Sequence, residues 1–497
     1  MSPTDLKNRT RQLNSAESDP SGDFVLYWMT SQRRTRWNHA LEHAGNIAAR
    51  LNKPLLVLEA LRSDYQHANR RHHSFILDGM LANAKALRGS PARYAAFVEE
   101  KAGQGKGLIK ALSEQACSVV TDDHPGFFYP QMQASAAEQC SVKLEAVDSC
   151  GLYPLHETDR CFHRAYDFRR HLQKTLKEHL EHLPNESPIP DSLPTLPFKE
   201  IRAASDWTLS DGEPSIDKEA LLSSLPIDQS VRETETEGGH EAGSAALEAF
   251  ITERLEGYQE DRNHPDQAGT SRLSPYLHYG HIGAHQIFQR ITKHESWTSE
   301  QLEPVSKGAR EGWWNMSPSA EAFLDQFITW RELGLQRAAR RGSKEGFQDL
   351  PTWALATLKE HEADERPHLY TLSDFEHALT HDDLWNAAQQ ELLQTGTIHN
   401  YLRMLWGKKI LHWTASPEEA FEVMLHLNDK YALDGRDPNS FSGILWVLGL
   451  HDRPWGPERP VFGKVRYMAS KNTYKKLRVN DYIQRWTPNN DLFSTQP

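Results

Sequence analysis

The sequence predicts an amino-terminal α/β domain built on a parallel, Rossmann-like sheet, followed by an all-α domain. The first observation is that short apolar runs alternate with helical segments over about the first 150 residues, the pattern of a doubly wound sheet. The second is that helix-start signals recur after about residue 244 without any strand signal. A chain of 497 residues is long enough for both domains.

The predicted strands are short runs of apolar and aromatic residues. They stand at 24–29 (FVLYWM), 54–60, 117–122 and 142–147, with helical segments at 37–52 and 73–87 between them. Ligands of such sheets bind beyond the carboxyl ends of the strands. No glycine-rich dinucleotide motif and no Walker loop follows any of these runs, which excludes an ordinary dinucleotide site there.

The composition changes between the two predicted domains. Residues 183–243 are first proline-rich and then acidic and glycine-rich, as in a connecting segment. They predict either a free linker or a partly ordered strap over both domains. The predicted division is a polar tail over 1–22, the α/β domain over 23–182, the connection over 183–243 and the helical domain over 244–497.

The helical part has three predicted helix starts. A Ser-Pro pair opens a periodic segment that runs over 317–340. Two further starts have the spacing of a capping box, Ser373 with Glu376 and Ser416 with Glu419. These signals predict long helices that pack through apolar faces.

Charge and cysteine usage limit the partners and the compartment. The formal net charge is −12, so a nucleic acid would have to meet a local basic patch. Residues 464–486 predict such a patch, because seven Lys and Arg, including Lys475 and Lys476, accompany one acid and three tyrosines. The alternative is a solvated surface helix. Four cysteines without C-x-x-C spacing, and no apolar run of about 20 residues, predict a soluble cytoplasmic protein without a membrane partner.

The segment 395–413 places two indoles on one predicted helix. Trp406 and Trp413 are seven residues apart and share a face, and Trp385 lies on the preceding helix. A row of indoles in a helical core is either packing or, if a redox cofactor lies at one end, a route for electrons.

Polar residues accompany these indoles. Asn400, Arg403 and Met404 stand at i, i+3 and i+4, so they project toward one cavity. Asp434 and Asp437 flank a Gly-Arg-Asp-Pro turn, and Arg403 is an expected partner of Asp434. The alternative is that both acids are solvated caps beside the turn.

Two more segments carry candidate ligand groups. Thr270, Ser271 and Ser274 precede a predicted helix, where hydroxyls bind an anionic phosphate or simply cap the helix. Gln326 and Trp330 stand at i and i+4, so an amide and an indole share one face. They predict either a grip on a heterocycle or a buried amide beside a core tryptophan.

Six segments together resemble the photolyase/cryptochrome flavoproteins, and most closely the class II cyclobutane pyrimidine dimer photolyases. They are VLYWMTSQRR, SRLSPYLHYGHIG, FLDQFITWREL, LWNAAQQELLQTGTIHNYLRMLWGKKILHWTASPEEA, LNDKYALDGRDPN and RPVFGKVRYM. The likeness follows the chain order over nearly the whole sequence and is densest from about 380 to 470.

This resemblance implies FAD in the helical domain and an antenna chromophore, of the 8-hydroxy-5-deazaflavin type, in the α/β domain. The residues implied at the FAD pyrophosphate are Tyr258, Thr270, Ser271, Leu273 and Ser274. Those implied at the rest of the cofactor are Arg403, Asp434, Asp437 and Asn428, the last facing flavin N5. The implied electron-transfer residues are Trp406, Trp385 and Trp413.

The implied activity is light-driven repair of UV-damaged DNA by a monomer. Excited, reduced FAD donates an electron to a flipped-out pyrimidine dimer, the cyclobutane ring opens, and the electron returns. The residues implied at the dimer are Gln326, Trp330, Asn400, Tyr401, Met404 and Trp446, with Lys475 and Lys476 on the DNA backbone.

One departure from the family pattern keeps alternatives open. Gln326 stands where class II photolyases usually carry Glu, and glutamine there resembles cryptochromes and (6-4) photolyases. Met404 argues against the (6-4) enzymes, which carry histidine at that place, and Asn400 resembles class I dimer photolyases. The alternatives are a cryptochrome-like blue-light receptor, a (6-4) photolyase and a flavoprotein that binds nucleic acid without photochemistry.

Overall fold

The computed structural model describes residues 6–211, 217–342 and 346–487. The chain forms two compact units, the first from Met1–Thr252 and Arg272–Ser343 and the second from Glu253–Ser271 and Lys344–Pro497. Residues 1–5 of the predicted tail, 212–216 of the predicted connection, and 343–345 and 488–497 of the predicted helical domain lie outside the described residues.

The first unit contains a six-stranded sheet in the order β1-β6-β5-β2-β3-β4. Its strands are β1 (Thr10–Gln12), β2 (Phe24–Met29), β3 (Leu55–Leu61), β4 (Arg93–Val98), β5 (Ala116–Asp122) and β6 (Leu144–Val147). All neighbours pair in parallel except β1, which pairs antiparallel with β6. The four predicted strands are confirmed. Both β1, which lies inside the predicted tail, and β4 were missed.

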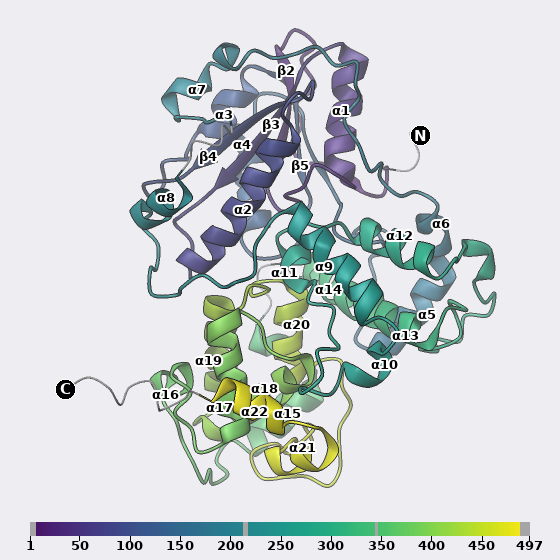
Figure 1. The fold of residues 1–497 in the computed structure, drawn as a ribbon, viewed down its shortest axis with the longest axis vertical. Coiled ribbons are helices and arrows are strands. Elements are labelled where there is room, and N and C mark those ends of the chain that lie inside the picture. The colour runs from purple at the N-terminus through teal and green to yellow at the C-terminus, as the bar shows by residue number, and fades with distance from the viewer. Residues whose placement is uncertain (1–5, 212–216, 343–345, 488–497) are drawn as a thin grey trace. The chain divides into compact units, whose positions relative to one another are not determined.

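Helices cover both faces of this sheet (Figure 1). Helices α1 (His39–Leu51) and α2 (Arg70–Ala86) connect β2, β3 and β4 and lie on one face, as right-handed crossovers require. Helices α3 (Leu108–Ser113) and α4 (Tyr129–Gln139) lie on the other. The central strand β2 is buried along its whole length, which explains why its sequence is a continuous apolar run.

The proline-rich segment is an ordered strap on the α/β domain in its described parts. It contains η1 (Phe198–Glu200), α7 (Ala203–Asp206) and α8 (Lys218–Ser224). The backbone of Ser210 exchanges two hydrogen bonds with Ala96 of β4, and the backbone N–H of Gly239 donates to His281 Nδ1. These contacts favour the strap over the free linker.

The rest of the first unit is helical. Its elements are α5 (Ala165–Thr175), α6 (Lys177–Leu180), α9 (His240–Glu253), α11 (Ser274–His278), α12 (Ala284–His294), η2 (Ser299–Gln301), α13 (Pro318–Leu324), η3 (Asp325–Trp330) and α14 (Arg331–Arg341). The helix predicted over 317–340 is therefore not continuous, because η3 is a π-helix between two α-helices. Its predicted start is confirmed, since the Ser317 hydroxyl accepts from the N–H of Ala320.

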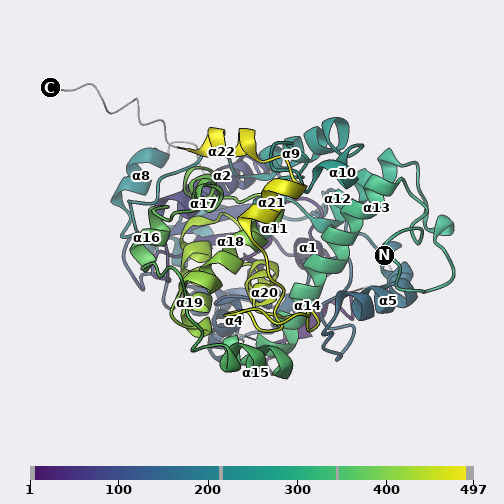
Figure 2. The same cartoon turned by 90° about the horizontal axis from the view of Figure 1, so that it is seen from below.

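The second unit is a bundle of helices (Figure 2). Its elements are α10 (Tyr258–Asp261), η5 (Phe347–Asp349), α15 (Thr352–Glu360), α16 (Leu372–Glu376), α17 (Asp383–Thr395), α18 (Asn400–Trp413), α19 (Pro417–Tyr431), α20 (Pro438–Val447), α21 (Ser470–Lys476) and α22 (Asn480–Trp486). Helix α18 packs against α17, α19 and α20 and supplies much of the core. Among the described residues, no helix is long and apolar enough to cross a membrane.

Of the two predicted capping boxes, the one at α16 is wrong and the one at α19 forms only in part. Helix α16 is capped by Thr371 with Asp374, so Ser373 lies inside the helix and forms no capping box with Glu376. The Ser416 hydroxyl caps α19 as expected, but the Glu419 carboxylate accepts from the N–H of Ala415, one residue before the cap. Two neighbouring hydroxyl residues compete as caps at α16, and sequence spacing alone did not separate them.

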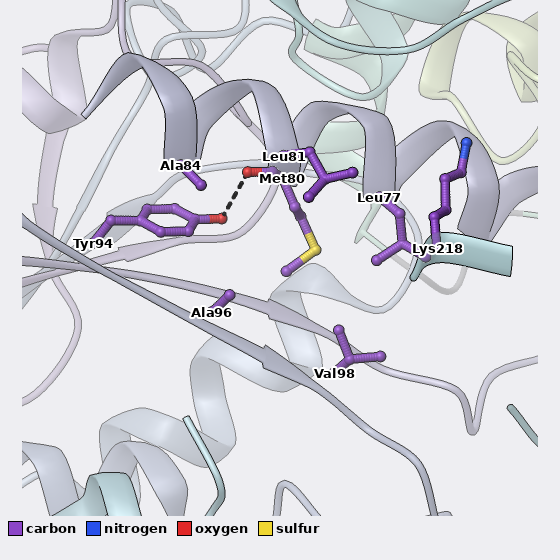
Figure 3. Close-up of a pocket in the computed structure, with 8 residues that line it drawn as sticks. All are labelled: Leu77, Met80, Leu81, Ala84, Tyr94, Ala96, Val98 and Lys218. Carbon is purple, nitrogen blue, oxygen red and sulfur yellow. Dashed lines mark hydrogen bonds between the residues drawn. The ribbon is translucent and has the colours of Figure 1, made fainter. Parts of the chain in front are cut away.

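A small apolar cavity lies between α2 and β4 (Figure 3). It measures about 20 Å³ and is lined by Leu77, Met80, Tyr94 and Val98 among others, with Lys218 of α8 at one end. That volume holds about one water molecule. The cavity therefore has no room for a flavin or a nucleotide.

Burial strongly lowers the pKa of three histidines of the first unit, His39, His281 and His285. Burial lowers the pKa of His281 to about 3 and that of the other two well below 6.5. The rings of His39 and His285 meet edge to face at 4.8 Å, and none of their nitrogens has a hydrogen bond within the described residues.

We expect this burial to make the protein acid-sensitive. As the pH falls below about 6.5, the unfolded chain protonates these imidazoles and the folded chain does not, so stability falls by up to about 1.4 kcal/mol per pH unit for each. Urea unfolding at about pH 7.5 and 5.5 measures the loss. The double variant His39→Leu, His285→Leu should lose less stability over this range, and an unchanged loss would place the acid sensitivity elsewhere.

Candidate functional site

The three predicted tryptophans of the helical unit lie in one row. The ring of Trp385 on α17 stacks parallel to that of Trp406 on α18, with centroids 6.4 Å apart and planes within 2°. The ring of Trp385 also meets that of Trp413 edge to face, with centroids 6.0 Å apart and planes at 69°. All three are at least 97% buried. Two residues from α18 are thus linked through a third from α17.

Hydrogen bonds fix the first two indoles of this row. Trp385 Nε1 donates to the backbone oxygen of Trp406 at 3.1 Å, and Trp406 Nε1 donates to Gln389 Oε1 at 2.9 Å. Gln389 follows Trp385 by one turn of α17, so the same helix face supplies the ring and the acceptor. Sequence reasoning missed Gln389, although its i+4 spacing from Trp385 was a usable signal.

The far end of the row approaches the surface. Trp413 contacts the rings of Tyr370 at 5.6 Å and His381 at 5.1 Å. The Tyr370 hydroxyl lies 2.6 Å from His381 Nδ1, and His381 is exposed. The row therefore runs from the packed centre of α17 and α18 to a solvent-facing Tyr–His pair that the sequence did not predict.

An ion pair lies near the start of α18. Arg403 Nη2 donates to both carboxylate oxygens of Asp434, at 2.9 and 3.2 Å. The turn that carries Asp434 is held by the backbone N–H of Arg436, which donates to the Asp429 carboxylate. The structure thus brings together the two residues that the sequence paired.

The side chain of Asn428 is held from both ends. Its Nδ2 donates to Asp429 Oδ1 at 2.9 Å, and the Ser440 hydroxyl donates to its Oδ1 at 3.1 Å. Ser440 belongs to α20 and Asn428 to α19, so the contact depends on how the two helices pack. Asp437 caps α20, as its side chain accepts from the N–H of Asn439.

Close packing positions α18 against α20. A side chain at Gly407 would approach Val447 Cγ2 to 2.7 Å and Met424 Sδ to 2.9 Å, so glycine is required for this approach. The buried amine of Lys408 donates to the backbone oxygen of Val447, the last residue of α20. Burial lowers the pKa of Lys408 to about 7.

The predicted dimer-binding residues of the second unit are only partly buried. On α18, Asn400 is exposed and Tyr401, Arg403 and Met404 are half-buried, whereas Leu402, Leu405 and Trp406 are in the core. Trp446 on α20 is also half-buried. Lys475 and Lys476 end α21 and are exposed.

The predicted hydroxyl cluster does not cap a helix. Helix α11 begins at Ser274 with the buried Leu273 at the cap position and no capping side chain. Within the described residues, the hydroxyls of Thr270, Ser271 and Ser274 make no hydrogen bond, so their donors are available to a ligand. Tyr258 is buried, with Arg262 5.8 Å above its ring.

In the first unit, Gln326 and Trp330 both belong to the π-helix η3. They are its two half-buried residues, and the other four are buried. π-turns are rare and occur frequently at functional sites. Gln326 is thus not a fully buried core amide, and the grip on a heterocycle stays a prediction.

Comparison with known proteins identifies the family. Residues 25–191 match the family model described as DNA photolyase. The deoxyribodipyrimidine photo-lyase of Methanothermobacter thermautotrophicus is 35% identical over 480 residues, which are 96% of this chain and 97% of that protein.

Two solved structures show the same fold. A class III photolyase from Agrobacterium tumefaciens superposes with a TM-score of 0.64 at 15% identity, over 95% of this chain and 88% of that one. An archaeal photolyase from Sulfolobus tokodaii, solved with two FAD molecules, gives 0.62 at 14%, over 93% and 90%. The predicted photolyase/cryptochrome architecture is confirmed. Because the Methanothermobacter relative is so similar over nearly the full length of both chains, this protein belongs to the DNA photolyase family.

Proposed function

We propose that this protein is a FAD-dependent photolyase that splits cyclobutane pyrimidine dimers in DNA under light. The observation that carries the proposal is the buried row Trp406–Trp385–Trp413, which begins on the helix that also bears Arg403. The row ends in contact with the Tyr370–His381 pair, and His381 is exposed, as a route for electrons between a buried cofactor and the solvent would require. The class II assignment remains a prediction.

The residues present fit FAD. The hydroxyls of Thr270, Ser271 and Ser274, which bind nothing else among the described residues, suit a pyrophosphate, together with Tyr258 and Leu273. Arg403, Asp434, Asn428 and Asp437 offer a guanidinium, carboxylates and an amide of the kind that binds a flavin ring and ribose. FAD also occurs in the Sulfolobus tokodaii photolyase. When bound and reduced, it would supply the photoexcited electron.

We assign recognition of the dimer to aromatic, apolar and amide side chains. Trp330, Tyr401, Met404 and Trp446 would cover the flipped bases with apolar and aromatic surface in place of the lost stacking. Gln326 and Asn400 would bond the polar edge of the dimer. An amide at 326 donates a hydrogen bond but holds no acidic proton, so Gln326 orients the dimer without protonating it.

Lys475 and Lys476 are proposed to contact the DNA backbone. Replacing both by Ala should weaken binding and reduce the slope of log K against log salt by about 2, since each lost phosphate contact removes roughly 0.9. Fluorescence anisotropy at several salt concentrations measures this slope. Replacing the exposed Lys106 and Lys110 of the α/β domain by Ala is the matched control, and an equal change there would argue against a local DNA-binding face.

The antenna, assembly state and domain boundaries remain proposals. We propose an antenna chromophore at the α/β domain, of the deazaflavin type. The structure of the Sulfolobus tokodaii photolyase contains two FAD molecules, which points to a novel light-harvesting cofactor in that protein. A second FAD is therefore the alternative antenna here. Extraction of the bound cofactors followed by chromatography distinguishes the two. We also propose that the protein is a monomer and that its helical FAD-binding domain spans 244–497.

Lesion choice separates this function from its rivals. We expect light to remove cyclobutane dimers from an oligonucleotide and to leave (6-4) photoproducts intact. Removal of (6-4) photoproducts alone would favour a (6-4) photolyase, the class that this chain resembles by carrying Gln326 at this position. A flavin that responds to light without any loss of either lesion would favour a cryptochrome-like receptor.

A further inference from the structure

The π-helix η3 is an irregular segment that needs support from outside. A π-turn inserts one residue into an α-helix and persists only where its surroundings fix it. In η3 this geometry buries Asp325, Phe327, Ile328 and Thr329 and leaves Gln326 and Trp330 half-buried. The direction of those two side chains thus depends on what holds the two ends of η3.

The first residue of η3 is held by a buried ion pair. Arg169 Nε of α5 donates to Asp325 Oδ1 at 2.7 Å, and both side chains are less than 10% exposed. Phe327 stacks parallel to Phe323 of α13, with centroids 5.5 Å apart. These contacts fix the start of the segment.

Arg331 and Glu332, which follow Trp330, hold the other end of η3. Arg331 Nη2 donates to the backbone oxygen of Cys150 at 2.9 Å. Both oxygens of the buried Glu332 carboxylate accept backbone N–H groups, from Leu152 at 2.8 Å and from Tyr153 at 2.9 Å. Each oxygen has its own donor, which an amide in the same place could not reproduce.

The loop that receives Glu332 is itself rigid. The Arg9 guanidinium donates to the backbone oxygens of Gly151 and Leu152, and the Asp148 carboxylate accepts from the N–H groups of Cys150 and Leu155. A side chain at Gly151 would lie 2.8 Å from Glu332 Cδ, so glycine is needed for the carboxylate to fit. Glu332 therefore joins η3 to a fixed part of the α/β domain.

We propose that Glu332 is a positioning residue that sets the direction of Trp330 and Gln326 and so the affinity for the damaged base pair. This inference rests on the proposed function. Burial raises the pKa of Glu332 to about 7, while Arg331, the two N–H groups and Arg9 act in the opposite direction. The carboxylate is thus costly to bury, and its two hydrogen bonds to the backbone of Leu152 and Tyr153 offset part of that cost.

The test compares Glu332→Gln with a control on the same helix. Glu332→Gln keeps the size of the side chain but sets its NH2 group against a backbone N–H. Gln336→Met removes a contact with the same loop, from Gln336 Nε2 to the backbone oxygen of Pro154 at 2.9 Å, one turn farther from Trp330. Gly151→Ala disturbs Glu332 from the loop side and replaces Glu332→Gln if that variant fails to fold.

We expect Glu332→Gln and Gly151→Ala to raise the Kd for dimer-containing DNA about tenfold, because a small misplacement of a binding group has effects of this order or larger. The Kd for undamaged DNA, FAD photoreduction and the repair yield per photon at saturating DNA should not change. Gln336→Met should bind the dimer like the wild type.

Two results would overturn this inference and leave the proposed function standing. One is wild-type affinity for dimer-containing DNA in both Glu332→Gln and Gly151→Ala. The other is an equal loss of that affinity in Gln336→Met. A wild-type protein that does not prefer dimer-containing DNA would overturn the proposed function, and this inference with it.

Discussion

Trp406→Phe should abolish photoreduction of oxidised, bound FAD and leave dimer repair by chemically pre-reduced protein intact. Trp406 lies at one end of the row, so a phenylalanine, which is much harder to oxidise than an indole, interrupts the route to Trp385 and Trp413. The substitution also leaves Gln389 Oε1 without its donor, which costs about 1–3 kcal/mol. Photoreduction is therefore measured by absorbance on folded protein with FAD bound.

Trp297→Phe is the matched control for this prediction. Trp297 is a buried indole of the first unit whose Nε1 donates to the backbone oxygen of Trp314 at 2.6 Å, whereas Trp406 Nε1 donates to the Gln389 side chain. It should lose similar stability and keep normal photoreduction. Normal photoreduction in Trp406→Phe would show that the row is packing and not an electron route.

Arg403→Met should cause loss of FAD together with a loss of stability. The substitution leaves the Asp434 carboxylate, whose side chain is 11% exposed, without its guanidinium. Breaking a fully buried pair costs about 3–5 kcal/mol, so we expect about 2–3 kcal/mol for this partly exposed one. FAD content after gel filtration and urea unfolding of the apoprotein measure the two effects.

Lys430→Met separates the two effects. Lys430 pairs with Glu376 in the same unit at 2.9 Å with comparable exposure, and Glu376 keeps its contacts with His426 and Tyr431, so the loss of Lys430 should cost less stability and no FAD. The double variant Arg403→Met, Asp434→Leu should recover part of the stability and still lack FAD. Equal FAD content in the Arg403→Met and Lys430→Met proteins would remove this ion pair from the flavin site.

The sheet was largely predictable because its central strands are buried on both faces. Strand β2 is a continuous apolar run and β3, β5 and β6 are mostly apolar, as strands of a parallel sheet between helices are. Strand β4 begins with Arg93 and contains three small or polar positions, and β1 has three polar residues at an edge. Neither has a local pattern that distinguishes it from a loop.

The π-helix was not predictable from local pattern. The sequence of η3 is compatible with an ordinary α-helix, and the contacts that hold η3 and the start of α14 come from Arg169, Leu152 and Tyr153, which lie more than 150 residues earlier. The same reason explains why local pattern does not single out Glu332. Its role depends on a loop that no spacing rule connects to it.

The candidate site was predictable where partners are close in sequence or chemically obligatory. Arg403 on α18 and Asp434 after α19 carry opposite charges, and the structure pairs them. The order of the indoles, with Trp385 between Trp406 and Trp413, required the packing of α17 on α18. The Ser440 contact of Asn428 likewise required the packing of α19 and α20.

The most direct test of the account is loss of dimers per absorbed photon by the pre-reduced wild-type protein. An oligonucleotide with one cyclobutane dimer is mixed with the protein and divided between blue light and darkness, and the intact pyrimidines are counted by chromatography. We predict restoration in the light that saturates with protein concentration, and none in the dark. Equal amounts of dimer in the two samples, with FAD bound and reduced, would contradict the account.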